Sequence, residues 1–254
     1  MADHTATAVN NGARDSFSRK GARRTGDTAR LAGVLYLVAG LPAAFSMMYV
    51  ARALTVPGDP AATGQKILGS ETLFRAGMAG ELISAVALLY VAILLYRLFC
   101  KVNATQARLM VTLALVSVPM SFLNVLNDLA AVTLLRGATV LSVFEPQQRS
   151  ALATLFLGLH HQGLILTQVF WGLWLLPLAL LVLQSKSFPR IVAYLLIAAC
   201  VGYVGSSVVW LLLPTYATVG NQIGLLLEGL GEPVFLAWLL FKGASVERLL
   251  NPSP

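Results

Sequence analysis

Charge is scarce in this sequence. Only 11% of its 254 residues are Asp, Glu, Lys or Arg, whereas a typical soluble domain carries about 25%. A chain with so little charge cannot cover a folded core with polar surface in water, and 57% of its residues are hydrophobic. This shortage excludes a soluble enzyme, a disordered chain and a coiled coil. We therefore expect an integral membrane protein.

Cysteine is scarce as well, since the chain has only Cys100 and Cys200. Two cysteines cannot build the disulfide framework of a small secreted module. No CxxC, Cys/His or HExxH spacing typical of a metal site occurs, so the sequence predicts neither a metal nor another cofactor. The first apolar segment has full spanning length and follows about thirty polar residues, so we expect no cleavable signal peptide.

The sequence is rich in long apolar stretches. Six of them reach the roughly 20 residues that a spanning helix needs. They cover residues 31–50, 72–96, 108–135, 150–183, 191–213 and 222–241. The sequence thus predicts an all-α polytopic membrane protein, a bundle of six transmembrane helices within residues 30–243. The fourth stretch is longer than a bilayer requires, so we expect it to tilt, kink, project or break in two.

The basic residues predict how these helices are oriented. The net charge is +7, and thirteen of the 18 Lys and Arg side chains fall in segments on the same side as the N-terminus. By the positive-inside rule both termini are cytoplasmic, in the inner membrane of a prokaryote. Residues 1–29 are expected to form a disordered basic tail, which acts as an orientation signal or contacts anionic lipid. Residues 244–254 are expected to form a short cytoplasmic tail.

Basic residues spread over helix ends and a tail do not form one folded basic face, so we expect no nucleic-acid partner. The lipid bilayer is the expected partner. Because six helices are few for a monomeric transporter, a homodimer is compatible with the sequence.

Ionisable residues inside spanning helices are costly and are the first place to look for function. The predicted helices contain Arg75, Glu81, Asp128, His160, His161, Glu228 and Glu232. At a rise of 1.5 Å per residue, all of them fall in the half of the bilayer away from the N-terminal side. This distribution predicts a polar chamber that opens towards the extracytoplasmic side.

Spacing groups several of these residues on common helix faces. Asn124 and Asp128 lie four residues apart, and His161 and Gln168 lie seven apart. Glu228 and Glu232 are again four apart, and Pro233 after them predicts a kink that frees a backbone carbonyl. The predicted ligand-binding residues are Arg75, Glu81, Asn124, Asp128, His161, Gln168, Glu228 and Glu232. No catalytic residue is predicted.

The chain resembles the bacterial membrane proteins of domain-of-unknown-function family 4386, over nearly all of its length after the tail. The resemblance rests on the segments ARLAGVLYL (29–37), LFRAG (73–77), FWGLWLLPL (170–178), FPR (188–190) and Glu232 with FLAWLLFKG (235–243). The family's acidic residue after the arginine of the second helix corresponds to Glu81, whereas Pro233 departs from the family pattern. The resemblance implies a compact multi-helix membrane protein and no particular activity.

Three functions fit these observations. The first is binding, or passage, of a small polar or cationic ligand, with the carboxylates as ligands, Arg75 as counter-charge and His161 as a titratable switch. The second is a membrane enzyme in which His161 and the carboxylates bind a metal or move protons. The third is a structural or sensory subunit whose buried charges only fix the registry of the helices. We expect the first rather than catalysis.

Overall fold

The structure is a computed structural model that describes residues 28–242. The predicted tails lie outside these residues, except that residues 28 and 29 already belong to the first helix. Six helices are long and apolar enough to span a membrane, and no strand occurs within residues 28–242. The predicted all-α polytopic bundle with six spans is confirmed.

The spans begin and end close to the predicted positions. The first covers Thr28–Leu54 and includes a π-helical segment, η1 (Phe45–Val50), followed by α2 (Ala51–Leu54). The others are α4 (Glu71–Phe99), α5 (Ala104–Arg136), the pair α6 (Pro146–Leu173) and α7 (Leu175–Ser185), α8 (Arg190–Leu212), and α9 (Ala217–Lys242). Short 3₁₀ turns, η2 (Thr139–Leu141) and η3 (Pro214–Tyr216), lie in two of the connections.

The fourth span is broken in two, one of the outcomes expected from its length. Helix α6 ends at Leu173, Trp174 forms the turn, and α7 begins at Leu175. Pro177 has no N–H to bond the carbonyl of Leu173, so the proline interrupts the helical ladder at this point. Both halves of the span, α6 and α7, pack against α5 and α8.

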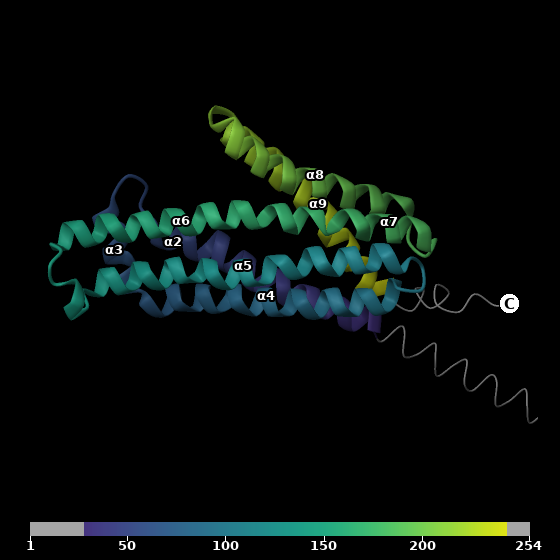
Figure 1. The fold of residues 1–254 in the computed structure, drawn as a ribbon, viewed down its shortest axis with the longest axis horizontal. Helices are drawn as coiled ribbons and strands as arrows, with labels where there is room; N and C mark the ends of the chain where they lie inside the picture. The colour runs from purple at the N-terminus through teal and green to yellow at the C-terminus, as the bar shows by residue number, and fades with distance from the viewer. Residues whose placement is uncertain (1–27, 243–254) are drawn as a thin grey trace, which may run out of the picture.

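The connection between the first two spans contains a helix outside the six predicted stretches, α3 (Pro60–Gly69). Asp59 caps it by accepting a hydrogen bond from the backbone N–H of Ala62 at 2.9 Å, and Pro60 is its first residue. Asp followed by Pro is a typical helix start, so the sequence contained the signal. Helix α3 contacts α5 and α6 and covers one end of the bundle (Figure 1).

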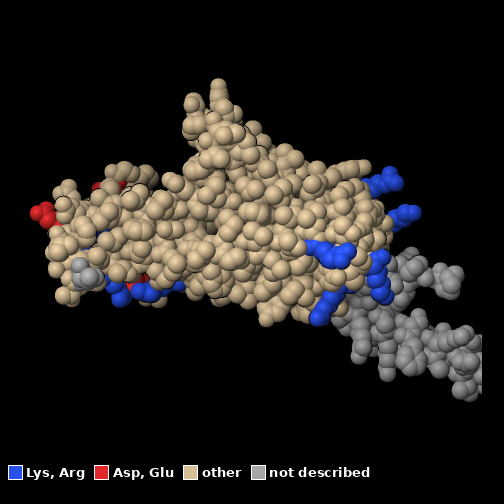
Figure 2. Space-filling view, in the orientation of Figure 1, with Lys and Arg blue, Asp and Glu red and all other residues tan. Residues whose placement is uncertain are grey.

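Helices α4, α5 and α6 lie side by side along the bundle, whereas the α8–α9 hairpin diverges from them at one end (Figure 1). Basic side chains gather at the opposite end, near the α7–α8 connection, and the body between is almost uncharged on the visible face (Figure 2). Arg97, Lys101, Arg108, Lys186 and Arg190 lie at the helix ends there.

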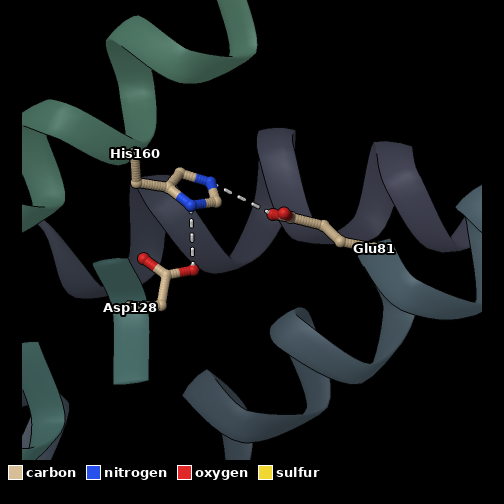
Figure 3. A group of neighbouring side chains, drawn as sticks. All are labelled: Glu81, Asp128 and His160. Carbon is tan, nitrogen blue, oxygen red and sulfur yellow. Dashed lines mark ion pairs between the residues drawn. The ribbon is translucent and has the colours of Figure 1, made fainter. Parts of the chain in front are cut away.

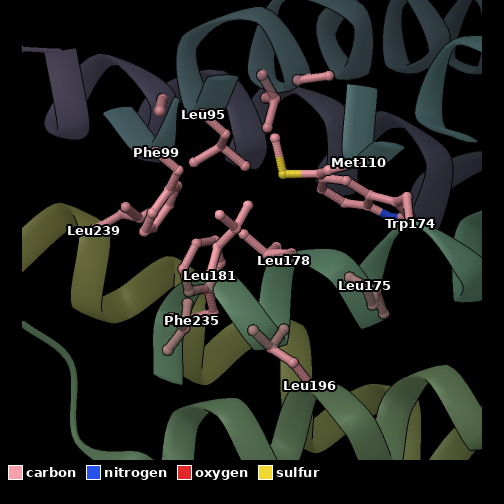
Figure 4. Packing of buried hydrophobic residues seen from close by; sticks show 14 of the residues in the cluster. Leu95, Phe99, Met110, Trp174, Leu175, Leu178, Leu181, Leu196, Phe235 and Leu239 are labelled. Atoms are coloured by element: carbon pink, nitrogen blue, oxygen red, sulfur yellow. The ribbon is translucent and has the colours of Figure 1, made fainter. Parts of the chain in front are cut away.

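The largest hydrophobic cluster occupies the half of the bundle nearer this basic end, and Figure 4 shows how its side chains pack. Trp174, Phe99 and Phe235 are buried completely or nearly so, and the Tyr36 ring meets Trp174 edge-on with centroids 6.0 Å apart. Lipid tails are as apolar as these side chains, so van der Waals packing rather than exclusion from water holds the helices together. Two smaller apolar clusters lie in the other half, together with Glu81, Asp128 and His160.

Glycines hold the α8–α9 hairpin together, and Gly231→Val should separate it. A Cβ at Gly231 would lie 2.5 Å from the carbonyl oxygen of Leu195 and 2.7 Å from the Cβ of Ala199. Because backbone cannot move aside cheaply, we expect a loss of about 1–3 kcal/mol in the free energy of unfolding, measured by SDS titration of the purified protein. At Gly229 a Cβ would meet nothing within 4 Å, so Gly229→Val is the matched control. Equal losses in both variants would contradict this packing role.

Candidate functional site

A cavity of about 760 Å³ lies in the polar half of the molecule. Its walls come from the end of the first span, the connection to α3, and helices α3, α4, α5, α6 and α9. It therefore lies where the α8–α9 hairpin diverges from α6, at the end of the bundle away from the basic helix ends. The ionisable or amide side chains that line it from α4, α5, α6 and α9 are Glu81, Asp128, His160, His161, Gln168, Asn221 and Glu228.

His160 lies between two carboxylates at the bottom of this cavity (Figure 3). Its Nε2 is 3.4 Å from Oε1 of Glu81, and its Nδ1 is 3.2 Å from Oδ2 of Asp128. The three side chains are between 8% and 12% exposed and come from α6, α4 and α5. This group, Glu81–Asp128–His160, is called the carboxylate–histidine group below.

The first spanning helix holds Glu81 in place. Ser46, on the π-helical segment η1, donates a hydrogen bond of 2.7 Å to Oε1 of Glu81. One turn further along α4, Ser84 donates to the carbonyl of Ala39. π-Helical segments are rare and are frequent at functional sites. Here the segment brings a hydroxyl donor to the same carboxylate oxygen that faces His160.

An amide pair supports His160 from α5. The side chain of Asn124 donates to the backbone carbonyl of His160 at 3.0 Å, and Asn127 donates to the Asn124 oxygen at 3.2 Å. Gly163 makes this approach possible, because a Cβ there would lie 2.0 Å from Oδ1 of Asn124. Asn124 thus binds the α6 backbone at His160 and does not itself belong to the carboxylate–histidine group.

Five of the eight predicted ligand-binding residues line the one cavity. They are Glu81, Asp128, His161, Gln168 and Glu228. Asn124 lies behind His160, as described. His161 and Gln168, which were predicted to share a face of α6, both border the cavity, as do Thr154 and Gly158. Whether any of these residues binds a ligand stays a prediction.

Arg75 does not line the cavity. Its Nε lies 2.6 Å from Oε1 of Glu71, and Arg136 reaches the same carboxylate with bonds of 2.6 and 2.8 Å. These charges tie the start of α4 to the end of α5. The predicted role of Arg75 as a counter-charge within the chamber does not fit this placement, because Glu71 is its partner.

Glu232 is also outside the cavity lining. It lies one helical turn from Glu228, and the only described residues near enough to influence it electrostatically are Glu228 and two tyrosines of other spans, Tyr36 and Tyr203, although the buried Tyr36 hydroxyl forms no hydrogen bond within the part of the chain that the structure describes. Pro233 after it is accommodated inside α9, which continues to Lys242. The two glutamates on one face of α9 therefore have different surroundings.

His160 lies at the centre of the carboxylate–histidine group but was not among the predicted ligand-binding residues, although it was among the ionisable residues of the predicted helices. The spacing argument selected His161, which is exposed on the cavity wall. A second stripe at the same spacing, Ala153, His160 and Thr167, lies on the inward face, and both Ala153 and Thr167 are buried. The residue types do not separate the two stripes, because the stripe of His161 also carries a hydroxyl, that of Thr154.

The lining can attract positive charge. Four carboxylates, those of Asp59, Glu81, Asp128 and Glu228, border the cavity, against one guanidinium, that of Arg52. The lining has no lysine. An acidic cavity with low-dielectric walls concentrates cations, and paired histidine and carboxylate groups can also bind a metal or exchange protons.

Comparison with known proteins gives the family and nothing finer. The chain matches no curated protein and no solved structure. The family described as "Domain of unknown function (DUF4386)" matches residues 31–243. This match covers all six spans almost completely, in agreement with the resemblance in sequence, and the chain therefore belongs to the DUF4386 family of multi-pass membrane proteins.

Proposed function

We propose that this membrane protein binds a small cationic ligand in its polar cavity. The observation that carries the proposal is the excess of carboxylates over arginine and lysine in the lining, four against one arginine, beside the two histidines His160 and His161. In the orientation expected from the basic residues, the cavity faces the extracytoplasmic side. A cation arriving from that side would meet Asp59 and Glu228 and then the carboxylate–histidine group.

Glu228 distinguishes a binding site from a purely structural charge cluster. Glu81 and Asp128 have His160 as a partner and so fit a structural role equally well. Glu228 borders the cavity but forms no ion pair or hydrogen bond with any residue that the structure describes. Because an ionisable side chain within a membrane is costly unless it is paired, an unpaired carboxylate at a cavity wall favours a partner from outside the chain.

Thermal unfolding of the detergent-purified protein tests the proposal. The probes are the chlorides of sodium, potassium, tetramethylammonium, ethanolammonium, zinc and manganese. We expect at least one of them to raise the unfolding midpoint, because a ligand at 100 times its Kd stabilises the folded state by about 2.7 kcal/mol. Glu228→Gln should remove most of this increase.

Glu71→Gln is the matched control, since it makes the same change at a carboxylate outside the cavity. It lowers the midpoint itself by breaking the ion pairs to Arg75 and Arg136, but the increase caused by the cation should remain. The proposal is wrong if no probe raises the wild-type midpoint. It is also wrong if Glu228→Gln and Glu71→Gln respond to the cation alike.

A further inference from the structure

We infer that the carboxylate–histidine group is a binding site for a divalent transition-metal ion, with Zn²⁺ as the best fit. The inference rests on the proposed function, because the cavity must admit a cation to this depth. It goes further by naming the class of ion and the three side chains that hold it.

The positions of the ligand atoms carry the inference. One ligand atom each from Glu81, Asp128 and His160 all lie within 4.8 Å of one another. Bonds from Zn²⁺ to nitrogen and oxygen are about 2.0–2.2 Å long, so two ligands of a tetrahedral ion lie about 3.4 Å apart. The distance from His160 Nε2 to Glu81 Oε1 is 3.4 Å. Oδ2 of Asp128 lies at the other ring nitrogen, 3.2 Å from Nδ1, so binding of one ion at Nε2 requires the Asp128 carboxylate or the imidazole to turn.

The types of ligand select the metal. An imidazole nitrogen with two carboxylates suits Zn²⁺, Mn²⁺ and Fe²⁺, whereas Mg²⁺ and Ca²⁺ prefer oxygen ligands alone. Three protein ligands also leave one position of a tetrahedral ion open. Since all three side chains line the cavity, that position faces a space that a water molecule or a small ligand can enter.

Surrounding hydrogen bonds hold the ligands in place. Ser46 donates to Oε1 of Glu81, and Asn124 donates to the carbonyl of His160. Side chains behind the direct ligands fix their orientation in metal sites and commonly raise metal affinity 10- to 100-fold. Four elements of the bundle (the first span, α4, α5 and α6) thus converge on one point within the membrane.

Metal counting on purified protein tests the inference. The protein is stripped with EDTA, dialysed against ZnCl₂, MnCl₂ or MgCl₂, and its bound metal is measured by elemental mass spectrometry. Wild type should bind one Zn²⁺ per chain and bind it more tightly than Mn²⁺ and Mg²⁺. His160→Ala and Glu81→Gln should lose the ion, and Asn124→Ala should weaken it by about 10- to 100-fold. His160→Cys should retain Zn²⁺, because a thiolate replaces the imidazole as ligand.

His4→Ala and Glu71→Gln remove the same groups away from the site and should leave one Zn²⁺ bound. His4 lies in the tail outside the described residues. The absorption spectrum of Co²⁺ bound to the wild-type protein is a second measurement that needs no variant to fold. A tetrahedral cobalt spectrum that Zn²⁺ displaces supports the site.

Wild type that binds no Zn²⁺ and gives no such cobalt spectrum overturns the inference. So does loss of the ion in His161→Ala with retention in His160→Ala. These failures are distinct from failure of the proposed function. If an organic or alkali cation still stabilises the protein through Glu228 while no metal binds, the cation-binding cavity stands and only the metal assignment falls.

Discussion

Replacing His160 with leucine is expected to lower the free energy of unfolding by roughly 3–5 kcal/mol. The substitution leaves Glu81 and Asp128 facing each other with no cationic partner, in a site where both side chains are at most 10% exposed. Removing one member of a buried ion pair is far more damaging than replacing the whole pair, because the remaining charge stays out of water without compensation. The measurement is SDS-induced unfolding of detergent-purified protein in EDTA, followed by circular dichroism.

The combined variant Glu81→Gln, Asp128→Asn and His160→Leu separates this cause from loss of packing. With both carboxylates replaced by amides, most of the lost stability should return. The change in the free energy of unfolding of the triple variant should therefore be smaller than the sum of the changes in the three single variants. His161→Leu is the matched control, because that exposed histidine has no ion pair among the described residues. It should change the stability by less than about 0.5 kcal/mol. A triple variant less stable than His160→Leu would contradict the electrostatic explanation.

The six spans could be predicted because spanning length is a property of the sequence alone. A run of apolar residues long enough for the bilayer has no alternative to helix, since every backbone group must be paired internally. The ends were less certain where polar residues enter a helix. The predicted sixth span began at residue 222, whereas α9 begins at Ala217, because Thr218 and Asn221 are polar and polar residues count against a span in any hydropathy average.

Periodicity alone could not choose between the two adjacent histidines. Consecutive residues of a helix point about 100° apart, so His160 and His161 belong to different stripes, and each stripe repeats at the same spacing. Only the neighbours of α6 decide which stripe is buried. Those neighbours, Glu81 on α4 and Asp128 on α5, are 79 and 32 positions earlier in the chain, and no local pattern places them beside His160.

The placement of Arg75 could have been anticipated. Glu71 lies four residues before it, and an acidic residue four positions before a basic one is a favourable pair on a helix. Treating Arg75 as already inside the bilayer hid this local partner. The second partner of Glu71, Arg136, comes from the end of α5, and this contact depends on how α4 and α5 pack.

Trp174→Ala is expected to lower the free energy of unfolding by roughly 3–5 kcal/mol. Trp174 is 1% exposed and forms the turn between α6 and α7, where it meets the Tyr36 ring edge-on. Its removal leaves a space that the first span, α5 and α7 cannot close without shifting, and the atoms that lined the indole lose their contacts. The same SDS titration measures this loss.

Leu176→Ala is the matched control. Leu176 lies in α7, two residues after Trp174, but its side chain is 42% exposed. Lipid replaces the contacts that an exposed leucine loses, whereas nothing replaces those of a buried indole. The Trp174→Ala variant should therefore be much less stable than the Leu176→Ala variant, although each substitution removes a large apolar side chain. Because the aromatic core and the cavity occupy opposite halves of the bundle, cations should still raise the midpoint of Trp174→Ala as they do that of wild type. A variant with a lowered midpoint and no response to cations would show instead that packing around Trp174 positions the cavity walls.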